Sequence, residues 1–371
     1  MRKLKILHAA DLHLDSPFEG LSAGKAAIRR KEQRELLARL ADLAVTEQVD
    51  LVLLAGDLLD SSNTYYETGE ELIRALRGIP VPVFIAPGNH DWYSAKSPYA
   101  RLRLPENVHV FTEQTIRSVV LPELHTRVFG AAFTEPNCGS LLDGFRCEKT
   151  EGMYSVLCLH GDALMKDSRY NPITEQQLER SNLDYAALGH IHKASGLLRA
   201  GSTWYSWPGC PEGRGFDETG EKTVNIVTLD GSLCELQTVS IAKRRYEVMR
   251  LNTEGEDPLL AIPSQIPDDT VSDVYRIILT GETDVPPDLN KLYENLSDMF
   301  FELQLRDETR LRKSVWDNAG EDTLRGLFLG RLRERFENAH SEEERIRIEQ
   351  AARWGLAALD NAEEVVQHED Q

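Results

Sequence analysis

Five short polar clusters carry the residues that could do chemistry, and each directly follows a run of apolar, strand-forming residues. The clusters are Asp11-Leu12-His13, Gly56-Asp57, Gly88-Asn89-His90-Asp91, His160-Gly161-Asp162 and Gly189-His190-Ile191-His192. Read as ligands, they offer two aspartates (Asp11 and Asp57), three or four histidines and one asparagine (Asn89). This mixture suits two divalent transition-metal ions, such as Mn²⁺, Fe²⁺ or Zn²⁺, and it suits Ca²⁺ poorly.

The chemistry expected of such a site is hydrolysis of a phosphate ester. About seven ligands shared by two ions require one bridging carboxylate and leave open positions for water. Two neighbouring cations polarise a phosphodiester and lower the pKa of bound water, which gives hydroxide near neutral pH. His90 adds an imidazole that can carry a proton near neutral pH. Taken alone, Gly88 to Asp91 could also be an ordinary turn.

The order of these motifs resembles the calcineurin-like metallophosphoesterase superfamily, in which an Asp-x-His motif comes first and a Gly-His-x-His motif comes last. Three stretches are also similar to the SbcD-like DNA repair exonucleases, in particular to their YhaO-like branch. These stretches are Ala9-Ala10-Asp11-Leu12-His13-Leu14, Gly56-Asp57-Leu58-Leu59-Asp60 and Trp207-Pro208-Gly209-Cys210-Pro211. The similarity covers roughly residues 1–240 of the chain.

The resemblance implies a role for each ligand. It assigns one ion to Asp11, His13, Asp57 and His192, and the other ion to Asp57, Asn89, His160 and His190, with Asp57 as the bridge. His90 matches the family's histidine that is not a ligand, and its implied role is to protonate or stabilise the leaving oxygen. Two divalent ions are implied, with Mn²⁺ as the first candidate and Fe²⁺, Zn²⁺ or Mg²⁺ as alternatives.

Five residues near the clusters are candidates for contact with a substrate. Arg29 and Arg30 lie at the start of the first expected helix, where they would contact phosphate or form a solvated helix end. Trp92 and Tyr93 would stack on a splayed base or pack on the sheet edge. Arg214 lies in a loop that resembles one in SbcD-like proteins, and it would meet a substrate phosphate or hold the loop.

The elements that position the clusters predict an α/β fold. The expected strands are residues 4–10, 50–55, 81–86, 154–159 and 185–188, and the expected helices are residues 23–48 and 67–77. Alternating strands and helices predict a parallel, twisted sheet with its site at the carboxyl ends of the strands. Residues 107–133 read as three short strands, and residues 194–240 as four antiparallel strands of a second sheet. The expected fold is a two-sheet metallophosphoesterase sandwich flanked by helices.

Three domains are expected. They are a metallophosphoesterase (nuclease) domain over residues 1–243, a small α+β cap over residues 244–306 and a helical C-terminal segment over residues 307–371. Apolar residues recur at helical spacing in the last segment, which is typical of a face that packs against another surface. These residues are Leu324, Leu327, Phe328, Leu332, Ile346, Ile348, Ala352, Trp354 and Leu356. The segment therefore packs on the cap or docks a partner protein.

The net charge of −19 on 371 residues is unusual for a protein that binds nucleic acid. However, residues 251–371 hold 28 acidic and 13 basic side chains, so most of the negative charge lies beyond the catalytic part. Two bound dications would bring the first 250 residues close to neutrality. No apolar run is long enough to span a membrane. The ligands in the first strand argue against a cleaved signal peptide, and five cysteines without a Cys-x-x-Cys pair indicate free thiols in a cytoplasmic protein.

Three functions are consistent with these residues. The resemblance implies a Mn²⁺-dependent DNA exonuclease or endonuclease of DNA repair that acts with an SbcC-like coiled-coil ATPase. The second function is a phosphatase or phosphodiesterase for a small phosphate ester, which would use the same metal ligands. The third is a structural subunit that keeps the metals but is regulated or inactive alone. Whether the chain forms a homodimer is left open.

Overall fold

The computed structural model describes residues 2–61, 64–312, 316 and 319–365, with side chains described as far as residue 359. The chain divides into two compact units, Met1–Arg245 and Tyr246–Gln371, and each is described here by itself. The separation of a cap from a C-terminal segment stays a prediction. Among the described residues, no helix is both long enough and apolar enough to cross a membrane.

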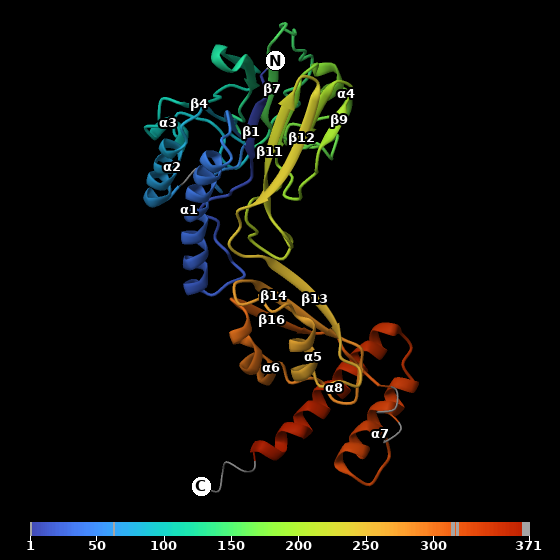
Figure 1. Cartoon of the computed structure of the whole chain (residues 1–371). Helices are drawn as coiled ribbons and strands as arrows, with labels where there is room; N and C mark the ends of the chain where they lie inside the picture. Colours follow the sequence, from blue (N-terminus) through green and yellow to red (C-terminus); the bar gives the residue numbers. More distant parts are fainter. Residues whose placement is uncertain (1, 62–63, 313–315, 317–318, 366–371) are drawn as a thin grey trace. The chain divides into compact units, whose positions relative to one another are not determined.

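The first sheet of unit 1 sets three ligand-bearing strands, β1, β2 and β3, side by side, and Figure 1 shows β1 next to β11 and β12. Its order is β12-β11-β1-β2-β3-β4. Strands β1 to β4 run parallel, whereas β11 pairs antiparallel with both β1 and β12. The bounds are β1 (Leu4–Ala9), β2 (Leu51–Leu54), β3 (Val83–Ile85), β4 (Val108–Val110), β11 (Thr223–Asp230) and β12 (Leu233–Ser240). The carboxyl ends of β1, β2 and β3 therefore lie at one edge.

The second sheet of unit 1 brings the last two ligand clusters together, because β7 and β8 are parallel neighbours. Its order is β5-β6-β7-β8-β10-β9. The bounds are β5 (Arg117–Leu121), β6 (Thr126–Gly130), β7 (Tyr154–His160), β8 (Tyr185–Gly189), β9 (Leu198–Ala200) and β10 (Thr203–Ser206). A 3₁₀ turn, η1 (Pro122–Leu124), joins β5 to β6.

The expectation that residues 194–240 form one second sheet is wrong. The β9–β10 hairpin does lie in the second sheet, where β10 pairs parallel with β8. The β11–β12 hairpin instead extends the first sheet beside β1. The reason is that β11 is apolar on both faces: Ile226 packs in the core beneath the helices and Val227 packs between the sheets. A strand that is apolar on both faces is stable only where both faces are covered.

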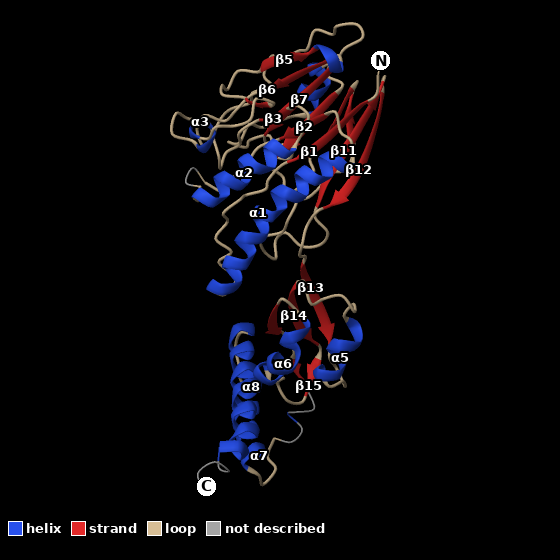
Figure 2. Ribbon diagram, turned by 60° about the vertical axis from the view of Figure 1, so that its left-hand side comes forward, coloured by secondary structure: helices blue, strands red, loops and turns tan. Residues whose placement is uncertain are grey.

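Unit 1 has four layers. The side chains of β1 point alternately to its two faces and show how the first sheet packs on both sides. Leu7 packs on one face with Leu36 and Leu72, which belong to the helices over the first sheet. Ile6 points to the opposite face and packs with Val156 between the two sheets. A further core lies on the outer face of the second sheet beneath α4. The helices are α1 (Ala23–Thr46), α2 (Tyr66–Gly78), α3 (Pro98–Arg101) and α4 (Glu175–Ser181), and Figure 2 shows α1 and α2 along the first sheet.

Unit 2 begins with three parallel strands that alternate with two helices. The sheet order is β13-β14-β16. The bounds are β13 (Tyr246–Asn252), α5 (Pro258–Gln265), β14 (Val274–Thr280), β15 (Glu282–Thr283), α6 (Leu289–Leu296), η2 (Ser297–Met299), β16 (Glu302–Asp307) and β17 (Arg310–Leu311). Ile262 and Leu292 pack both helices against Ile277 of the sheet. Helix α5 is not predicted from the sequence, because Pro263 interrupts its apolar run.

The unit ends with α7 (Leu324–Glu337) and α8 (Glu342–Val365). The apolar stripe expected on α8 is split between two directions. Ala352 and Leu356 are buried against Leu329 of α7. Trp354 and Ile346 are instead exposed, with 77% and 47% of their surface accessible. One part of the stripe therefore packs α8 on α7, and the other part faces outward.

Candidate metal centre

All seven residues predicted as metal ligands come together at the carboxyl ends of β1, β2, β3, β7 and β8. Six of the residues here form three overlapping groups of three residues. Within each group, one potential ligand atom of every residue lies within 4.8 Å of those of the other two. These groups are Asp11 with His13 and His192, Asp11 with Asp57 and His160, and Asp57 with His13 and His90. Their overlap places both aspartates at the centre of the cluster.

Asn89 and His190 complete the cluster on the side of His160. The Oδ1 atom of Asn89 lies 3.0 Å from Nε2 of His160 and 3.1 Å from Nδ1 of His190. The Oδ2 atom of Asp57 lies 3.3 Å from Nε2 of His160 and 3.8 Å from Nε2 of His13. Asp57 therefore lies between the two halves of the donor set, as a bridging ligand must.

The backbone turns sharply at four of these ligands. Asp11, His13, Asp57 and His190 have positive φ angles of 55°, 44°, 51° and 91°. The left-handed region is unfavourable for residues with a side chain, and such strain gathers at functional sites. Hydrogen bonds from the Asp11 amide to the Gly56 carbonyl and from the His13 amide to the Asp57 carbonyl hold the first two loops in register. The turns aim successive side chains at one point.

Asp91 is not in any of these three groups. Its hydrogen bonds connect the loop that carries Asp57 to the loop that carries Asn89. Its carboxylate is fully buried and accepts hydrogen bonds from the amides of Gly88, at 2.7 Å, and Leu58, at 2.8 Å, and from the Tyr99 hydroxyl. A Cβ atom at Gly88 would collide with the Asp57 carboxylate. The Gly88 and Asp91 positions of the motif thus hold the backbone close to Asp57.

Three of the histidines are oriented by hydrogen bonds on their outer nitrogen. His13 Nδ1 lies 3.0 Å from Asp60 Oδ1, and His160 Nδ1 lies 2.9 Å from the Ala55 carbonyl oxygen. His192 Nδ1 lies 2.7 Å from Glu218 Oε1. In each case the partner accepts, so Nδ1 carries the proton and Nε2 is left to face the cluster. Metal-binding histidines in proteins commonly have such an outer partner.

Glu218 is a functional candidate that sequence analysis misses. It lies in the loop before β11, is almost fully buried and accepts hydrogen bonds from the Arg214 side chain as well as from His192. Burial opposes ionisation, but the hydrogen bonds from His192 and Arg214 hold the pKa of Glu218 well below its usual range. No spacing in the sequence marks this residue, because its contact with His192 joins two segments that are far apart in the chain.

Burial and the neighbouring carboxylates shift the pKa values of the histidines in the cluster. Burial lowers the pKa of His13 and of His190 to about 4, which leaves both imidazoles neutral at pH 7. Burial also opposes a charge on His160, but the negative charge of Asp57 raises the pKa of His160 to about 9. A proton on His160 thus compensates the buried carboxylates in the metal-free protein. Metal ligands bind in their deprotonated form, so metal binding would release this proton.

His90 belongs to one of the three groups of potential ligands, and at 45% its side chain is the most exposed among the five histidines of the cluster. Its Nδ1 atom lies 3.2 Å from the Asp60 carbonyl oxygen, and its ring packs edge-on against the ring of His13, with centroids 4.8 Å apart. Its backbone amide donates to Asp57 Oδ1 at 2.9 Å. The imidazole therefore lies close to the Asp57 carboxylate and is open to solvent.

Arg214 is the predicted substrate residue that does reach the cluster. Its guanidinium lies 3.3 Å from Asp60 Oδ1, 2.6 Å from Glu218 Oε1 and 3.2 Å from His192 Nδ1. Arg214 thus contacts both carboxylates that orient ligand histidines. These contacts favour the alternative in which it holds the loop and its carboxylates in place.

Arg29 does not fit its predicted contact with phosphate. Its side chain is fully buried and pairs with Glu32 and Glu212 at 2.7 and 2.6 Å. It also donates to the Gly213 carbonyl, next to Arg214 in the sequence. A guanidinium enclosed by protein acceptors has no face for a substrate, so we remove Arg29 from the candidates. Its place in the structure is to tie α1 to the loop that carries Arg214.

The other three candidates lie outside the donor cluster. Arg30 donates to the Pro17 carbonyl at 3.2 Å and is half-buried. Tyr93 is half-buried against the core, and its amide donates to the Phe133 carbonyl at 2.7 Å, which favours packing on the sheet. Trp92 is half-buried beside it.

Comparisons with known proteins agree with this site. A family model described as "Calcineurin-like phosphoesterase" matches residues 4–194. The uncharacterized metallophosphoesterase YhaO of Bacillus subtilis (strain 168) is 28% identical over 332 residues, which cover 84% of this chain and 80% of that protein. The DNA double-strand break repair protein Mre11 of Saccharolobus solfataricus is 23% identical over 301 residues, covering 75% of this chain and 76% of Mre11.

A shorter match links the chain to a nuclease. The SbcD component of the nuclease SbcCD of Rhodobacter capsulatus is 36% identical over 110 residues, which cover 28% of this chain and 24% of SbcD. The family match spans all five ligand clusters, from Asp11 to His192. The donor set of carboxylate, imidazole and amide groups fits the two divalent metal ions that this family uses. The chain belongs to the calcineurin-like phosphoesterase family and is a hydrolase of phosphoric esters.

Proposed function

We propose that this protein is a DNA nuclease of DNA repair that depends on two divalent ions, with Mn²⁺ as the first candidate. One observation carries the proposal: seven donor side chains from five distant clusters converge, with an exposed imidazole beside them. The names of the DNA double-strand break repair protein Mre11 and of the nuclease SbcCD support DNA as the substrate, because both are similar to this chain, over 301 and 110 residues.

Asp11, His13, Asp57 and His192 would hold one ion, and Asp57, Asn89, His160 and His190 would hold the other. The mixed oxygen and nitrogen donors support this division, since they suit Mn²⁺, Fe²⁺ or Zn²⁺. When bound, the two ions would polarise the phosphodiester and lower the pKa of a water molecule. The contacts of Asp57 with the histidines of both halves support its role as the bridge.

His90 would act as the general acid for the leaving oxygen. Its Nδ1 donates to the Asp60 carbonyl, since a carbonyl oxygen only accepts, and this bond fixes the ring. The proton that can be delivered is therefore the one on Nε2. The exposure of the ring supports this role, because a leaving group needs access to the acid. Asp60 would position His90 through its carbonyl and His13 through its carboxylate.

The experiment that tests the substrate compares three phosphodiesters under identical conditions. End-labelled single-stranded DNA, end-labelled duplex DNA and bis(p-nitrophenyl) phosphate are incubated with the protein and either Mn²⁺ or Mg²⁺. The proposal expects cleavage of DNA at low substrate concentration. Turnover of the small ester alone, with both DNAs left intact, would instead support the phosphatase or small-ester phosphodiesterase.

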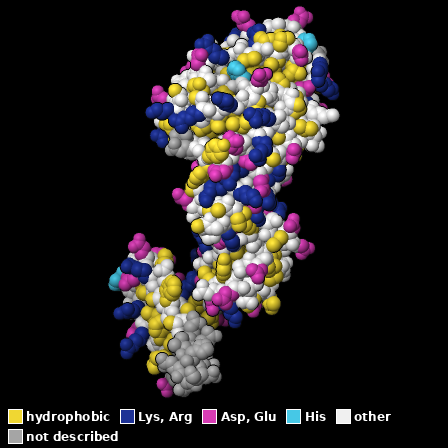
Figure 3. Space-filling view, turned by 90° about the vertical axis from the view of Figure 1, so that its left-hand side faces the viewer, with side chains coloured by type: hydrophobic (Ala, Val, Ile, Leu, Met, Phe, Trp, Pro, Cys, Tyr) yellow, Lys and Arg dark blue, Asp and Glu magenta, His cyan; other side chains and the backbone are white. Residues whose placement is uncertain are grey.

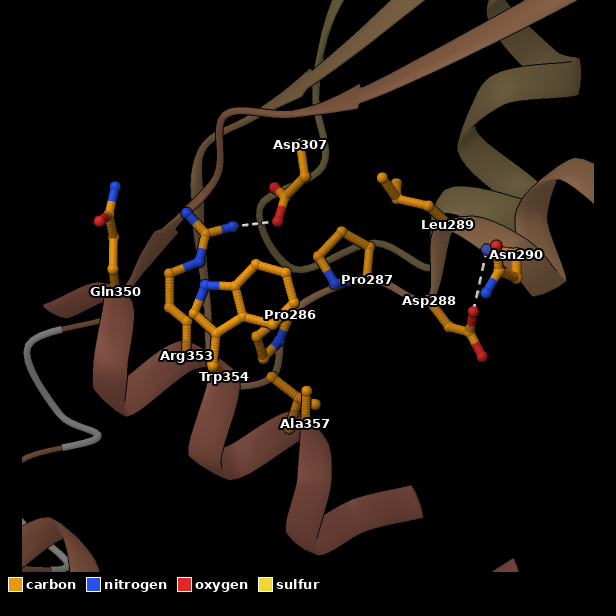
Figure 4. Close-up of a pocket in the computed structure, with 11 residues that line it drawn as sticks. Pro286, Pro287, Asp288, Leu289, Asn290, Asp307, Gln350, Arg353, Trp354 and Ala357 are labelled. Atoms are coloured by element: carbon orange, nitrogen blue, oxygen red, sulfur yellow. Dashed lines mark hydrogen bonds and ion pairs between the residues drawn. The ribbon is translucent and has the colours of Figure 1, made fainter.

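We also propose that the C-terminal helices dock an SbcC-like coiled-coil ATPase. The exposed Trp354 supports this role, and it lines a cavity of about 640 Å³ within unit 2. Figure 4 shows Trp354 on α8 beside Pro286 and Pro287, with Arg353 paired to Asp307 at the end of β16. Such an exposed aromatic group in a concave site is typical of an anchor for a partner.

Substitution of Trp354 tests whether this residue binds a partner or only packs within unit 2. Trp354→Ala should abolish capture of the ATPase in a pull-down while leaving the melting temperature and DNA cleavage unchanged. Tyr293→Ala is the matched control, because Tyr293 is an exposed aromatic residue on α6. Undiminished capture of the ATPase by Trp354→Ala would refute this docking surface.

A further inference from the structure

Unit 1 has a cavity outside the donor cluster that the proposed function does not use. This cavity of about 340 Å³ lies between the first turn of α2 and the segment around α3. This volume falls within the range of roughly 300–1,000 Å³ that is typical of small-ligand sites. Tyr65 and Tyr66 line the wall at the start of α2, and Lys96, Pro98, Arg101 and Leu102 line the wall of the segment around α3.

The two tyrosines are unusually exposed for aromatic side chains. Tyr65 has 57% and Tyr66 has 77% of its surface accessible. Other aromatic residues of unit 1, such as Tyr154 and Tyr185, are fully buried in the core. Aromatic rings exposed in this way offer flat faces on which a nucleobase can stack, with little dependence on the base.

Two basic side chains complement the rings. Lys96 and Arg101 are exposed, and neither has an ion-pair partner among the side chains that the structure describes. Arg74, on the same helix as Tyr66, pairs with Glu71 instead. Figure 3 shows the side of unit 1 that bears α1, α2 and α3, where basic and hydrophobic side chains are intermixed. Glu70 is the acidic residue of the cavity, so the two cations outweigh it.

Thr64 also lines the cavity. Its hydroxyl oxygen is closed off from solvent and has no hydrogen-bond partner within the described part of the chain, so this atom is not available to a ligand in the cavity.

Both walls of the cavity are tied to the metal centre. The Tyr65 amide and the Thr68 hydroxyl donate to the Asp15 carboxylate, two residues after His13. On the other wall, the Tyr99 hydroxyl donates to Asp91, the residue that follows His90. Thr64 lies four residues after Asp60, which contacts His13, and four residues span at most about 14 Å.

We propose that this cavity binds an unpaired nucleotide of the DNA strand that is cut at the metal centre. Tyr65 and Tyr66 stack on the base, while Lys96 and Arg101 contact the adjoining phosphates. Thr64 lines the cavity and lies no more than about 14 Å from Asp60, a distance of at most about four nucleotides at a rise of 3.4 Å. The proposal rests on the proposed nuclease function and deepens it, since it selects single-stranded DNA or frayed ends over intact duplex.

The test measures binding and cleavage by the full-length protein with labelled single-stranded and blunt duplex oligonucleotides. Tyr66→Ala should raise the Kd for single-stranded DNA about 5- to 100-fold, the loss expected for one stacked base. Tyr66→Phe should keep wild-type affinity, because the ring remains. Lys96→Ala and Arg101→Ala should each lower the slope of log Kd against log salt by about 0.7, as expected for one lost phosphate contact.

Two further variants serve as controls. Hydrolysis of the small ester tests the metal centre independently of the pocket. Tyr293→Ala and Lys31→Ala remove an exposed ring and an exposed cation elsewhere, and both should bind as wild type does. All variants should hydrolyse bis(p-nitrophenyl) phosphate at the wild-type rate, since the metal centre is unchanged.

Three outcomes would overturn the proposal. If the wild-type protein cuts DNA and the pocket variants bind and cut it equally well, the pocket is excluded and the nuclease function stands. If the wild-type protein hydrolyses only the small ester, the nuclease function fails and the pocket fails with it. If Tyr66→Ala halves the molecular mass in solution without changing DNA affinity, the rings form a contact between two copies of this chain instead.

Discussion

The Oε1 atom of Glu218 lies 2.7 Å from Nδ1 of His192, and the carboxylate is almost fully buried. Because Arg214 binds the same carboxylate, Glu218 is held in place on both sides. The pair fixes the His192 ring so that its Nε2 faces the donor cluster. Outer partners of this kind raise the basicity of a ligand imidazole and set its orientation.

Glu218→Gln should weaken the binding of one metal ion by about 10- to 100-fold, the usual effect of losing an outer partner. The glutamine keeps the size of the side chain but removes the charge that favours the Nδ1–H form of His192. Titration of Mn²⁺ into metal-free protein by calorimetry measures this affinity. Glu221→Gln, an exposed neighbour in the sequence, is the control. Two unchanged binding constants would show that Glu218 does not support His192.

Asp57→Ala should lose both metal ions. Its carboxylate lies between His13 and His160, so its removal takes a ligand from each half of the site. Metal analysis of the purified, folded variant measures the stoichiometry. Asp230→Ala, at an exposed aspartate of unit 1, should keep the wild-type metal content. Two ions per chain in Asp57→Ala would contradict the bridging role.

His90→Ala should keep both ions and bind DNA, but it should lose turnover by about 10²- to 10⁴-fold, the usual contribution of a general acid. The exposed ring lies beside the donor cluster, where it can reach a leaving oxygen. Single-turnover cleavage rates, measured beside metal content, separate the two roles. His109→Ala, at an exposed histidine outside the cluster, is the control. A variant that lacks one ion would identify His90 as a ligand.

Glu32 should make the stability of unit 1 depend on pH in the acid range. Burial opposes ionisation, but hydrogen bonds from Arg244 and Arg29 lower the pKa of Glu32 from 4.5 to about 2. A lowered pKa stabilises the fold above the unfolded value of 4.5, and this stability is lost as the pH falls toward 2. The contribution at pH 7 is on the order of 3 kcal/mol.

Urea unfolding of wild type and Glu32→Gln measures this contribution. The difference in free energy of unfolding should be constant from pH 7 to pH 5 and should shrink by pH 3.5. Glu35→Gln, on the same helix but at a more exposed carboxylate, should show little difference at any pH. A difference between wild type and Glu32→Gln that does not change with pH would rule out the charge of Glu32 as its source.

The convergence of the seven donor side chains could be predicted from the sequence because each cluster follows its own apolar strand. Asp11, Asp57 and Asn89 end neighbouring parallel strands, so the topology alone brings them together. Glu218 and Asp60 could not be assigned, since their roles depend on contacts between loops. Such contacts arise only once the fold has formed.

Arg29 and β11 show where local patterns mislead. A basic residue at a helix start reads as solvated or phosphate-binding, but Arg29 is buried by Glu212, a residue 183 positions away. The β11–β12 hairpin has the local pattern of a meander with β9 and β10, but the burial of both faces of β11 directs it to β1. At both places, burial by residues that are distant in the sequence therefore decides the structure, and the local sequence pattern does not.

The most direct test of the two-metal account titrates Mn²⁺ into chelator-treated wild-type protein while DNA cleavage is measured. The donor set supports two ions that share Asp57, so activity should be absent without metal and should reach its plateau only at two ions per chain. Calorimetry on the same samples gives the number bound. Full cleavage of DNA in excess chelator, or a plateau at one ion per chain, would contradict the account.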